Sequence, residues 1–455
     1  CRMGAEMRLR TSFFAIVLLL AAASAPTDTT AQSLEDKAAL LSLDAAYRAK
    51  VDASSLEDDR TRALDLIHKI IERISHSFIE PYAIRELANF AASTLRRQPI
   101  ETPPTDLAYA AIDTLVRRLN DPYATFDERR MRKRGKRTGS IGIEATIVDG
   151  QLKVIAPLDG SPAQKAGVEP GDLIVEIDRE AVHGATLTEA MRRIRGPLGT
   201  DVLLRIQRKG AQKIGLPVPR TRFRVRPVRN GMFGDFAYIR IAFFGPNTEK
   251  LLRKALAEIR AEMKGGAPRA YILDLRNNPG GLVGQAVLVA DAFLEKGMIV
   301  ATSGRDNKGS RRFDAYRGDY IKGLPIILLQ NQATASAAEI VSAALRDNRR
   351  AVIMGTRSYG KGIVQTAYPF GALGRIKFTT HQYMTAAGLQ IHEVGVLPDI
   401  VVNSDPRPTY GAAAVAINRC PVAGKSEDRM LGCAILFLQN DGRIDRFVNA
   451  LPKMQ

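Results

Sequence analysis

The stretch LPIILLQNQATASAAEIVSAALRDNRRAVIMG, from Leu324 to Gly355, contains the pattern that decides the fold. An apolar run (LPIILLQ) is followed by small residues, by the helix-like segment SAAEIVSAALRDN and by a second apolar run (AVIMG). Short, continuous apolar runs joined by a helix are typical of parallel strands buried on both faces of a sheet. The same alternation extends over residues 220–404, so we predict an α/β domain with a largely parallel sheet there.

Three polar or glycine-rich segments follow predicted strands of this domain. They are RNNPGG (276–281) after YILDL, NQATA (331–335) after PIILLQ, and TRSYGKG (356–362) after AVIMG. In open α/β sheets, ligands and reacting groups collect at the carboxyl ends of the strands. The reacting groups are therefore expected in these three loops.

The third loop contains Lys361, where two familiar patterns overlap. GxxxxGK, from Gly355, is part of a phosphate-binding loop, but Gly362 stands where that loop needs Ser or Thr. The residues that follow, IVQTAYPF, also favour a strand over the required helix. SxxK, from Ser358, is the nucleophile signature of penicillin-binding enzymes, but two glycines oppose its helical turn and the companion motifs SDN and KTG are absent. Neither pattern explains the lysine.

A lysine can act as a base only when it is neutral, and burial among apolar groups lowers its pKa. Its nucleophile must then come from another segment, and Ser336 is the best candidate. Ser336 stands at the predicted start of a helix, where backbone N–H groups favour negative charge, and its neighbours are small. On this segment alone, a helix-capping hydroxyl is the simpler interpretation.

The segment 1–31 has the pattern of a secretory signal peptide. Arg8 and Arg10 precede TSFFAIVLLLAAASA, an apolar run of about a dozen residues, whereas a membrane-spanning helix needs about 20. Ala25 and Ala31 are alternative ends of the signal, and retention as an anchor is the alternative to cleavage. We therefore expect a protein of the periplasm or cell envelope.

The net charge of +18 raises the question of a polyanionic partner. The sharpest basic run, RRMRKRGKR (129–137), contains no aromatic residue on which bases could stack, and the chain contains no Trp. These features argue against nucleic acid and leave two interpretations, contact with an anionic envelope surface and a solvated linker. The five histidines are scattered without metal-ligand spacing, so no metal site is expected.

Three further segments flank or interrupt the α/β domain. Residues 34–138 are predicted as helices followed by the basic linker, because apolar positions recur at helical spacing. Residues 139–213 are predicted as a compact domain of short strands with two helices, and residues 405–455 as a helical segment. Cys420 and Cys433 are either a disulfide pair or two unpaired thiols.

Several motifs together resemble one family. LNDPYATF, DLRNNPGG, TASAAEIVSAALRDN, SYGKGIVQ and GVLPDI follow in the order found in the C-terminal processing (tail-specific) serine peptidases, peptidase family S41. The resemblance covers residues from about 60 to 402, and the domain at 139–213 resembles the PDZ module of bacterial members. It implies an exported serine endopeptidase with a ClpP/crotonase-like core that cleaves polypeptides near their C-termini without a cofactor. A catalytically silent PDZ scaffold and another exported acyl hydrolase, acting through Ser358, are the alternatives.

The resemblance assigns catalytic roles residue by residue. Ser336 matches the nucleophile, Lys361 the general base, and Gln365 the glutamine that orients the lysine. The backbone N–H groups of Gly280 and Ala337 match the oxyanion hole.

Four other positions near these motifs are less clearly assigned. Gly281 is the alternative glycine donor of the oxyanion hole. Asp347 matches an aspartate linked to activity, although a charge near the end of its helix is the simpler interpretation. The family often shows SAS-E, whereas this chain has Ala338 in place of the second serine. Glu339 is interpreted as an acid in the first turn of a helix.

The PDZ module is expected to choose substrates and to gate activity. GSIGIEA resembles the loop that holds a peptide's C-terminal carboxylate, through Ile141, Gly142 and Ile143, beside which the peptide adds as a strand. Arg195 is a candidate regulatory residue that couples the module to the active site, and a solvated helix-end arginine is the alternative. The N-terminal helices resemble a dimerising segment, so a homodimer is expected, and an activator or adaptor protein is a further candidate partner.

Overall fold

The computed structural model describes residues 29–127, 138–208, 212–264, 266–307, 309–316, 318–404, 412–423 and 428–452. The basic run 129–137 lies outside the described residues, and so does the expected signal segment except for its last three positions, which begin the first helix. No helix in the described part of the chain is long and apolar enough to cross a membrane.

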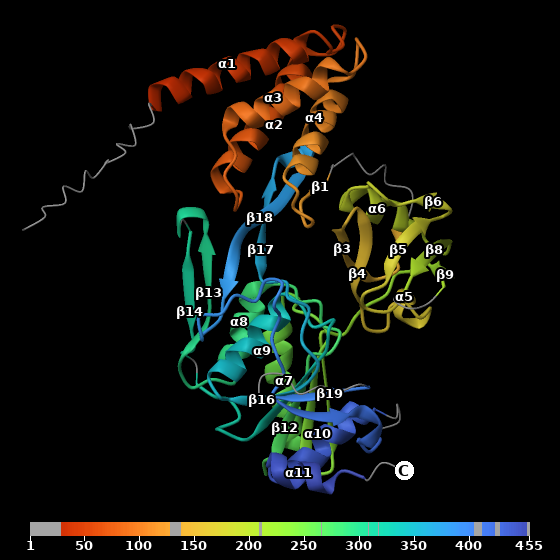
Figure 1. Cartoon of the computed structure of the whole chain (residues 1–455), viewed down its shortest axis with the longest axis vertical. Coiled ribbons are helices and arrows are strands. Elements are labelled where there is room, and N and C mark those ends of the chain that lie inside the picture. Colours follow the sequence, from red (N-terminus) through yellow and green to blue (C-terminus); the bar gives the residue numbers. More distant parts are fainter. Residues whose placement is uncertain are drawn as a thin grey trace, which may run out of the picture.

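Four helices form a bundle at the N-terminal end of the molecule (Figure 1). Their apolar side chains recur at three- and four-residue spacing, so each helix has one face that can be buried against the others. In the second helix Ile67, Ile70, Ile71 and Ile74 lie on that face and are buried. The helices are α1 (Thr29–Arg48), α2 (Glu57–Ser77), α3 (Ile84–Arg96) and α4 (Pro104–Arg118).

A seven-stranded sheet forms the centre of the largest domain, with the strand order β10-β11-β12-β15-β16-β19-β20. Neighbouring strands are parallel from β11 to β20, and β10 is antiparallel at one edge, which confirms the predicted α/β core. The strands are β10 (Val228–Phe233), β11 (Phe236–Ile241), β12 (Ala270–Asp274), β15 (Ile326–Gln330), β16 (Ala351–Gly355), β19 (Ile400–Asn403) and β20 (Ala413–Ala416).

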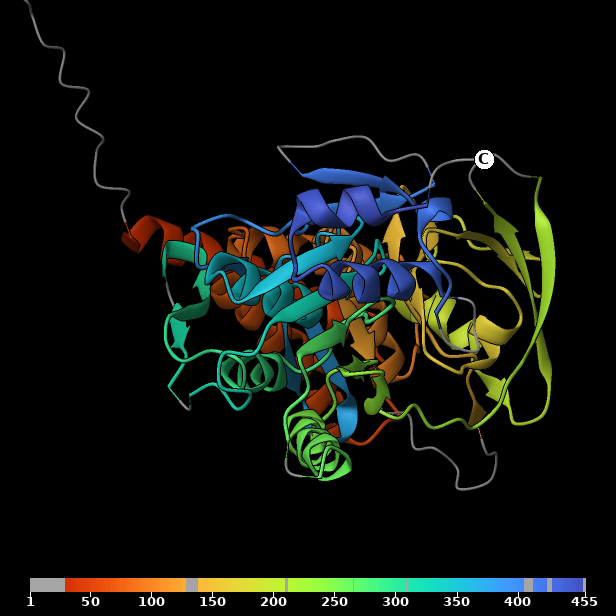
Figure 2. The same cartoon turned by 90° about the horizontal axis from the view of Figure 1, so that it is seen from below.

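Helices cover both faces of this sheet, which explains its continuous apolar runs. Leu328 packs toward one group of helices, whereas its neighbours Ile327 and Leu329 pack toward the C-terminal helices on the other face. Figure 2 shows the C-terminal helices and α7 on opposite sides of the strands. The helices are α7 (Thr248–Glu262), α8 (Val283–Asp291) and α9 (Ala337–Asp347) on the first face, and α10 (Arg429–Gln439) and α11 (Ile444–Ala450) on the second.

A second sheet, antiparallel, reaches from the core into the bundle (Figure 1). Phe378 of this sheet contacts Phe78, directly after α2, with ring centroids 6.0 Å apart. The segment MIVATS follows the alternation of the parallel core, but it pairs within this second sheet, because periodicity identifies a strand and not its partner. The strands are β1 (Thr125–Asp127), β13 (Met298–Gly304), β14 (Arg311–Asp314), β17 (Ile363–Pro369) and β18 (Arg375–Met384), with short 3₁₀ turns η1 (Arg305–Asn307) and η2 (Gly371–Leu373).

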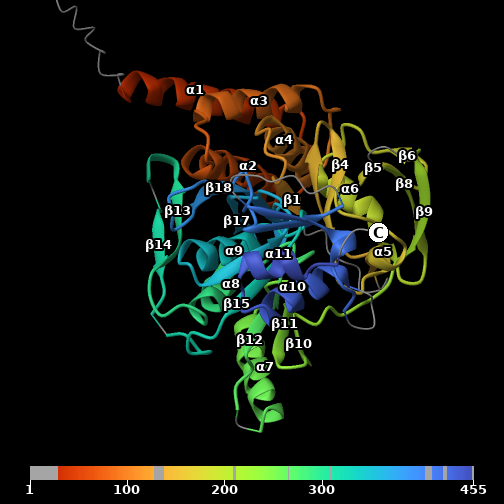
Figure 3. The same cartoon turned by 60° about the horizontal axis from the view of Figure 1, so that its bottom comes forward.

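The PDZ module, here residues 138–219, lies beside the core and the bundle (Figure 3). Its main sheet has the order β3-β4-β5-β8-β9, and its last strand continues to Pro219, beyond the boundary at 213 expected from the sequence. Its elements are β2 (Thr138–Gly139), β3 (Ile143–Val148), β4 (Gln151–Pro157), α5 (Pro162–Lys165), β5 (Leu173–Ile177), β6 (Glu180–Ala181), α6 (Leu187–Ile194), β7 (Gly196–Pro197), β8 (Asp201–Gln207) and β9 (Ile214–Pro219).

The C-terminal segment returns to the core through β20, the 3₁₀ turn η3 (Ile417–Arg419), α10 and α11. Cys420 and Cys433 form a disulfide with an S–S distance of 1.97 Å, so the paired alternative is the one found. Arg276, at the end of β12, forms an ion pair with Asp428, the residue that caps α10. The disulfide-closed segment therefore contacts the first of the three predicted loops.

Candidate active site

The three predicted loops lie side by side at the carboxyl ends of β12, β15 and β16. The first loop meets the second where the Ala335 N–H donates to the Asn278 carbonyl at 2.9 Å. The second meets the third where the Tyr359 N–H donates to the Thr334 carbonyl at 2.9 Å. The loops selected from the sequence by the strand-end rule are thus brought together.

Ser336 has an unusual backbone conformation directly before α9. Its φ of 55° and ψ of −120° lie in a region that side chains other than glycine rarely adopt, and such strain is concentrated at functional sites. Gly280 lies against it: a Cβ at position 280 would be 2.8 Å from the Ser336 Cβ, and the φ of Gly280 is +99°. The Ser336 side chain is also within hydrogen-bonding reach of the Tyr383 hydroxyl, whose pKa is raised by burial.

Lys361 is buried, with 7% of its surface exposed, although it stands in a loop. The two glycines that flank Lys361 allow the backbone to carry its side chain inward. Gly360 has a φ of +91°, and Gly362 lies so close to His392 that a Cβ would be 2.1 Å from the His392 backbone nitrogen. Burial lowers the pKa of the Lys361 ammonium, which is the change that a general base requires.

The ammonium group of Lys361 contacts two side chains from outside the core. Nζ lies 4.1 Å from the ring centroid of Tyr123, which precedes β1, and 4.0 Å from Glu144 Oε1 on β3. No hydrogen bond joins Lys361 to Ser336 within the described residues, and the buried Gln365 Nε2 has no hydrogen-bond partner there either. The loops of the expected dyad are adjacent, but the lysine side chain is turned toward the PDZ module.

Glu339 links the two loops, and the sequence did not reveal this role. Its fully buried carboxylate accepts hydrogen bonds from the N–H groups of Ser336 (2.7 Å), Gly360 (2.7 Å) and Lys361 (2.8 Å), and from the Ser358 hydroxyl (2.5 Å). Burial raises the pKa of Glu339 to about 7, and the four donors oppose that rise. A glutamate in the first turn of a helix resembles an ordinary helix-end acid, so no local signal distinguishes it.

The expected oxyanion donors differ in their present hydrogen bonds. The Gly280 N–H donates to Asn278 Oδ1 at 2.9 Å and is therefore engaged. Within the described residues, the N–H groups of Gly281 and Ala337 have no hydrogen-bond acceptor. Ala337 is the first residue of α9, where unpaired N–H groups and the helix dipole favour negative charge. In this state the two N–H groups free to bind an oxyanion are those of Ala337 and of Gly281, the alternative glycine.

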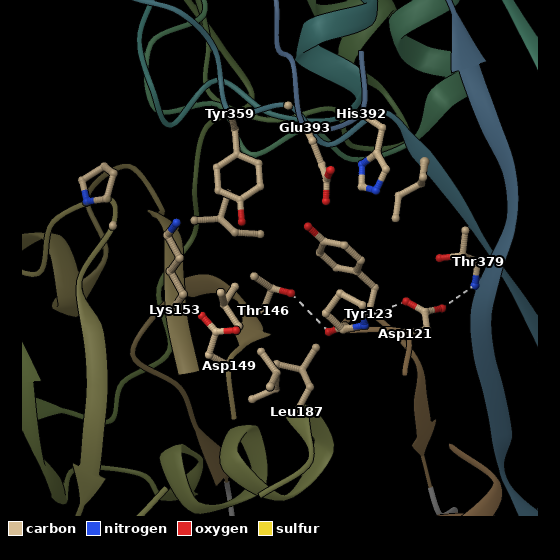
Figure 4. Close-up of a pocket in the computed structure, with 18 of the residues that line it drawn as sticks. Asp121, Tyr123, Thr146, Asp149, Lys153, Leu187, Tyr359, Thr379, His392 and Glu393 are labelled. Carbon is tan, nitrogen blue, oxygen red and sulfur yellow. Dashed lines mark hydrogen bonds between the residues drawn. The ribbon is translucent and has the colours of Figure 1, made fainter. Parts of the chain in front are cut away.

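A cavity of about 1830 Å³ is lined by Gln332 of the second loop and by residues 356–360 of the third, and Ser336 and Lys361 are not among its lining residues. It is larger than the about 300–1,000 Å³ of ordinary small-molecule sites. Two hydrogen bonds fix its walls, from the Thr146 hydroxyl to the Pro122 carbonyl (3.2 Å) and from the Thr379 N–H to Asp121 (2.8 Å). The size fits an extended polypeptide. In Figure 4 the side chains that face the cavity come from the PDZ module, from the segment before β1 and from core loops: Asp149, Lys153 and Leu187, then Tyr123, then Tyr359, His392 and Glu393.

The expected carboxylate-binding loop begins the edge strand β3. Gly142 has a φ of +76°, and the side chains of Ile141 and Ile143 are buried in the core of the module. Within the described residues β3 pairs only with β4, so its other edge is open to an added strand. Glu144, the next residue of β3, is the one that reaches Lys361.

Two sequence candidates lie away from Ser336. Arg195 is exposed at the end of α6 and forms no ion pair with a described residue, so its regulatory role stays a prediction. Asp347 ends α9, about 16 Å from Ser336 by the helical rise, and accepts a hydrogen bond from the Ala387 N–H at 2.8 Å. That position favours the structural interpretation of Asp347. The described residues contain no group of His, Cys, Asp and Glu side chains suited to a metal ion.

Comparison with known proteins gives consistent matches. The model of peptidase family S41 matches residues 235–402, and a PDZ domain model matches residues 153–208. The carboxy-terminal-processing protease of Bartonella bacilliformis is 40% identical over 321 residues, 70% of this chain and 74% of that protein. The carboxy-terminal processing protease CtpA of Bacillus subtilis is 34% identical over 306 residues, 66% of this chain and 65% of that protein.

A solved structure extends the comparison to the fold. The photosystem II D1 C-terminal processing protease superposes with a TM-score of 0.66 and 25% sequence identity. The superposition covers 79% of this chain and 99% of that one. The similarity therefore includes most of the described domains and not the α/β core alone.

Proposed function

The chain belongs to peptidase family S41 and is a C-terminal processing serine protease, and on that premise we propose that Ser336 is its nucleophile and Lys361 its general base. One observation carries the proposal. The strained serine before α9 and a buried lysine stand on loops that are joined through one carboxylate, that of Glu339.

The chemistry follows from these groups. Neutral Lys361 takes the proton of Ser336 Oγ while that oxygen attacks a peptide carbonyl, and the C–N bond then breaks to leave an acyl-enzyme ester. Backbone N–H groups beside Ser336 stabilise the oxyanion. Lys361 gives the proton to the leaving amine and then activates the water that hydrolyses the ester.

The spacing of the two loops supports this pairing. The N–H groups of Ser336 and Lys361 both donate to Glu339 Oε2, at 2.7 and 2.8 Å, so a single oxygen atom bridges the two backbones. Rotation of the lysine side chain would then carry Nζ toward the serine hydroxyl. Gln365, the match to the lysine-orienting glutamine, would then accept a hydrogen bond from Nζ through its amide oxygen.

Gating by the PDZ module is the second part of the proposal. Glu144 and Tyr123 hold the ammonium of Lys361 away from Ser336, and Glu144 stands on the edge strand beside which a substrate C-terminus would add. A peptide held by Ile141, Gly142 and Ile143 would displace Glu144 and release the lysine. Substrate binding and formation of the dyad are then coupled.

Export and dimerisation complete the proposal. The signal-like segment 1–31 supports export to the cell envelope, and the disulfide of Cys420 and Cys433 fits an oxidising compartment. Leu34 and Leu41 are 66% and 69% exposed on α1, seven residues apart and so on one face. That apolar face supports a homodimer formed through the N-terminal bundle.

Cleavage of casein or of a reporter with an apolar C-terminal tail tests the mechanism. Ser336→Ala and Lys361→Ala should each abolish cleavage, whereas Ser358→Ala should retain measurable activity. Because burial lowers the pKa of Lys361, activity should rise with pH through a limb below the ordinary lysine value of about 10.4. Full activity of Ser336→Ala would overturn the proposal.

A further inference from the structure

Ser358, the serine of the discarded SxxK pattern, is buried at the centre of the site, with 4% of its surface exposed. Its hydroxyl donates to Glu339 Oε1 at 2.5 Å and accepts a hydrogen bond from the Val396 N–H at 2.7 Å. The hydroxyl is thus fixed between a carboxylate and the backbone of the neighbouring loop. Both hydrogen bonds tie the hydroxyl to neighbouring loops, so its position indicates a structural task.

The carboxylate of Glu339 uses its full capacity for hydrogen bonds. Oε1 accepts from the Ser358 hydroxyl and the Gly360 N–H, and Oε2 accepts from the N–H groups of Ser336 and Lys361. Two acceptor sites on each oxygen are the complete set for an ionised carboxylate. Loss of one donor would leave one acceptor site of a buried charged oxygen unsatisfied, which is more costly than the loss of a bond between neutral groups.

We propose that Ser358 and Glu339 form a clamp that fixes the nucleophile loop and the base loop relative to each other. Ser358 is a positioning residue in this clamp, because it acts through Glu339 and not on the substrate. The inference rests on the proposed Ser336–Lys361 dyad and adds to it the residues that fix the relative position of the two loops.

The ionised form of Glu339 is the form that the clamp needs, because a protonated carboxyl oxygen becomes a donor and the group can no longer accept all four hydrogen bonds. Burial raises the pKa of Glu339 to about 7, and the hydrogen bond from Ser358 is the largest effect that lowers it. The ionisable groups that face Glu339 are Lys361, Tyr359 and Tyr383. Removing the Ser358 hydroxyl should therefore raise the pKa of Glu339 and make the clamp fail at a higher pH.

The test is a double-mutant cycle with the full chain and a reporter polypeptide. Ser358→Ala should lower kcat about tenfold, with KM within about twofold, and should move the acid limb of the pH profile to higher pH. Glu339→Gln should lower kcat about a hundredfold or more, because its amide NH₂ would face two N–H donors. In the Glu339→Gln background, Ser358→Ala should cost nothing further, because the clamp is already lost.

Ser342 provides a matched control. It is a buried serine of α9 whose hydroxyl has no hydrogen-bond partner among the described residues. Ser342→Ala should leave kcat and the pH profile unchanged. Equal kcat for Ser358→Ala and Ser342→Ala, or additive losses in the double mutant, would overturn the clamp. Ser336→Ala, assayed in parallel, separates this result from failure of the dyad itself.

Discussion

Two glutamates lie near Lys361 and hold it in different ways. Glu339, at the start of α9, is fully buried and joins the loops of Ser336 and Lys361 through three hydrogen bonds from backbone N–H groups and one from the Ser358 hydroxyl, all of 2.5–2.8 Å. Glu144, on β3 of the PDZ module, has a side chain that is 48% exposed, and its carboxylate lies 4.0 Å from the lysine ammonium. The first contact is part of the fold of the core, and the second joins two domains.

The difference separates the framework of the site from its restraint. Buried, fully satisfied polar networks are rigid, whereas a half-exposed ion pair is worth no more than about 1 kcal/mol. Under the proposed gating, the loops would stay fixed at rest while movement of the PDZ module releases the lysine.

The largest effect is expected from Gly280→Ala, which disturbs the framework. A Cβ there would lie 2.8 Å from both the Ala335 carbonyl oxygen and the Ser336 Cβ, and the φ of +99° disfavours any side chain. We expect kcat to fall about a hundredfold or more, since displaced oxyanion donors alone cost that much. Steady-state cleavage of a reporter measures it.

Gly284→Ala is the matched control for Gly280→Ala. Gly284 lies in α8 with no atom within contact of a built Cβ. Activity should be unchanged, and the free energy of unfolding should rise by about 0.5–1 kcal/mol, because alanine favours a helix more than glycine does. Normal activity of Gly280→Ala would show that the loop tolerates displacement and would contradict a rigid framework.

A smaller effect, and of opposite sign, is expected from Glu144→Gln. Without the carboxylate the lysine loses a restraint, so basal kcat should rise about two- to fivefold, the factor that about 1 kcal/mol allows. Because the Glu144 charge raises the pKa of Lys361, its removal should also move the rising limb of the pH profile to lower pH.

Glu176 provides the control for Glu144. It stands on β5 of the same module, and no described residue forms an ion pair with it. Glu176→Gln should leave unchanged both the basal kcat and the rising limb of the pH profile. A loss of activity in Glu144→Gln would mean that Glu144 assists catalysis and does not restrain it.

The smallest effect is expected at Tyr123, the other partner of the ammonium. The lysine lies over the ring, 4.1 Å from its centroid, so Tyr123→Phe should change basal kcat by less than about twofold. Tyr123→Leu removes the aromatic face and should raise basal kcat about twofold, equivalent to about 0.5 kcal/mol. Equal rates for the two variants would show that the ring does not hold the lysine.

The sequence predicted much of the core that holds the loops of Ser336 and Lys361, but little of the contacts that hold the lysine side chain. The apolar runs around Ser336 and the loop of Lys361 indicated the parallel core, and the strand-end rule placed the reacting loops together. Glu339 was interpreted only as a helix acid, because three of its four partners stand 19–22 residues later and are reached through the fold. Periodicity contains no information about such contacts.

The position of the lysine side chain could not be predicted for the same reason. Tyr123 and Glu144 lie far upstream of Lys361 in the sequence, and only the packing of three domains brings them to its ammonium. Ser358 shows a related limit. The sequence argued against an SxxK nucleophile, but it gave no reason for a hydroxyl to be there.

Peptide mapping by mass spectrometry after treatment with a fluorophosphonate serine probe tests most directly whether Ser336 is the nucleophile. We expect a single adduct, on the peptide that contains Ser336, formed faster in Glu144→Gln than in the native sequence and absent in Ser336→Ala. An adduct on Ser358, or unchanged cleavage of the reporter once Ser336 is fully labelled, would contradict it.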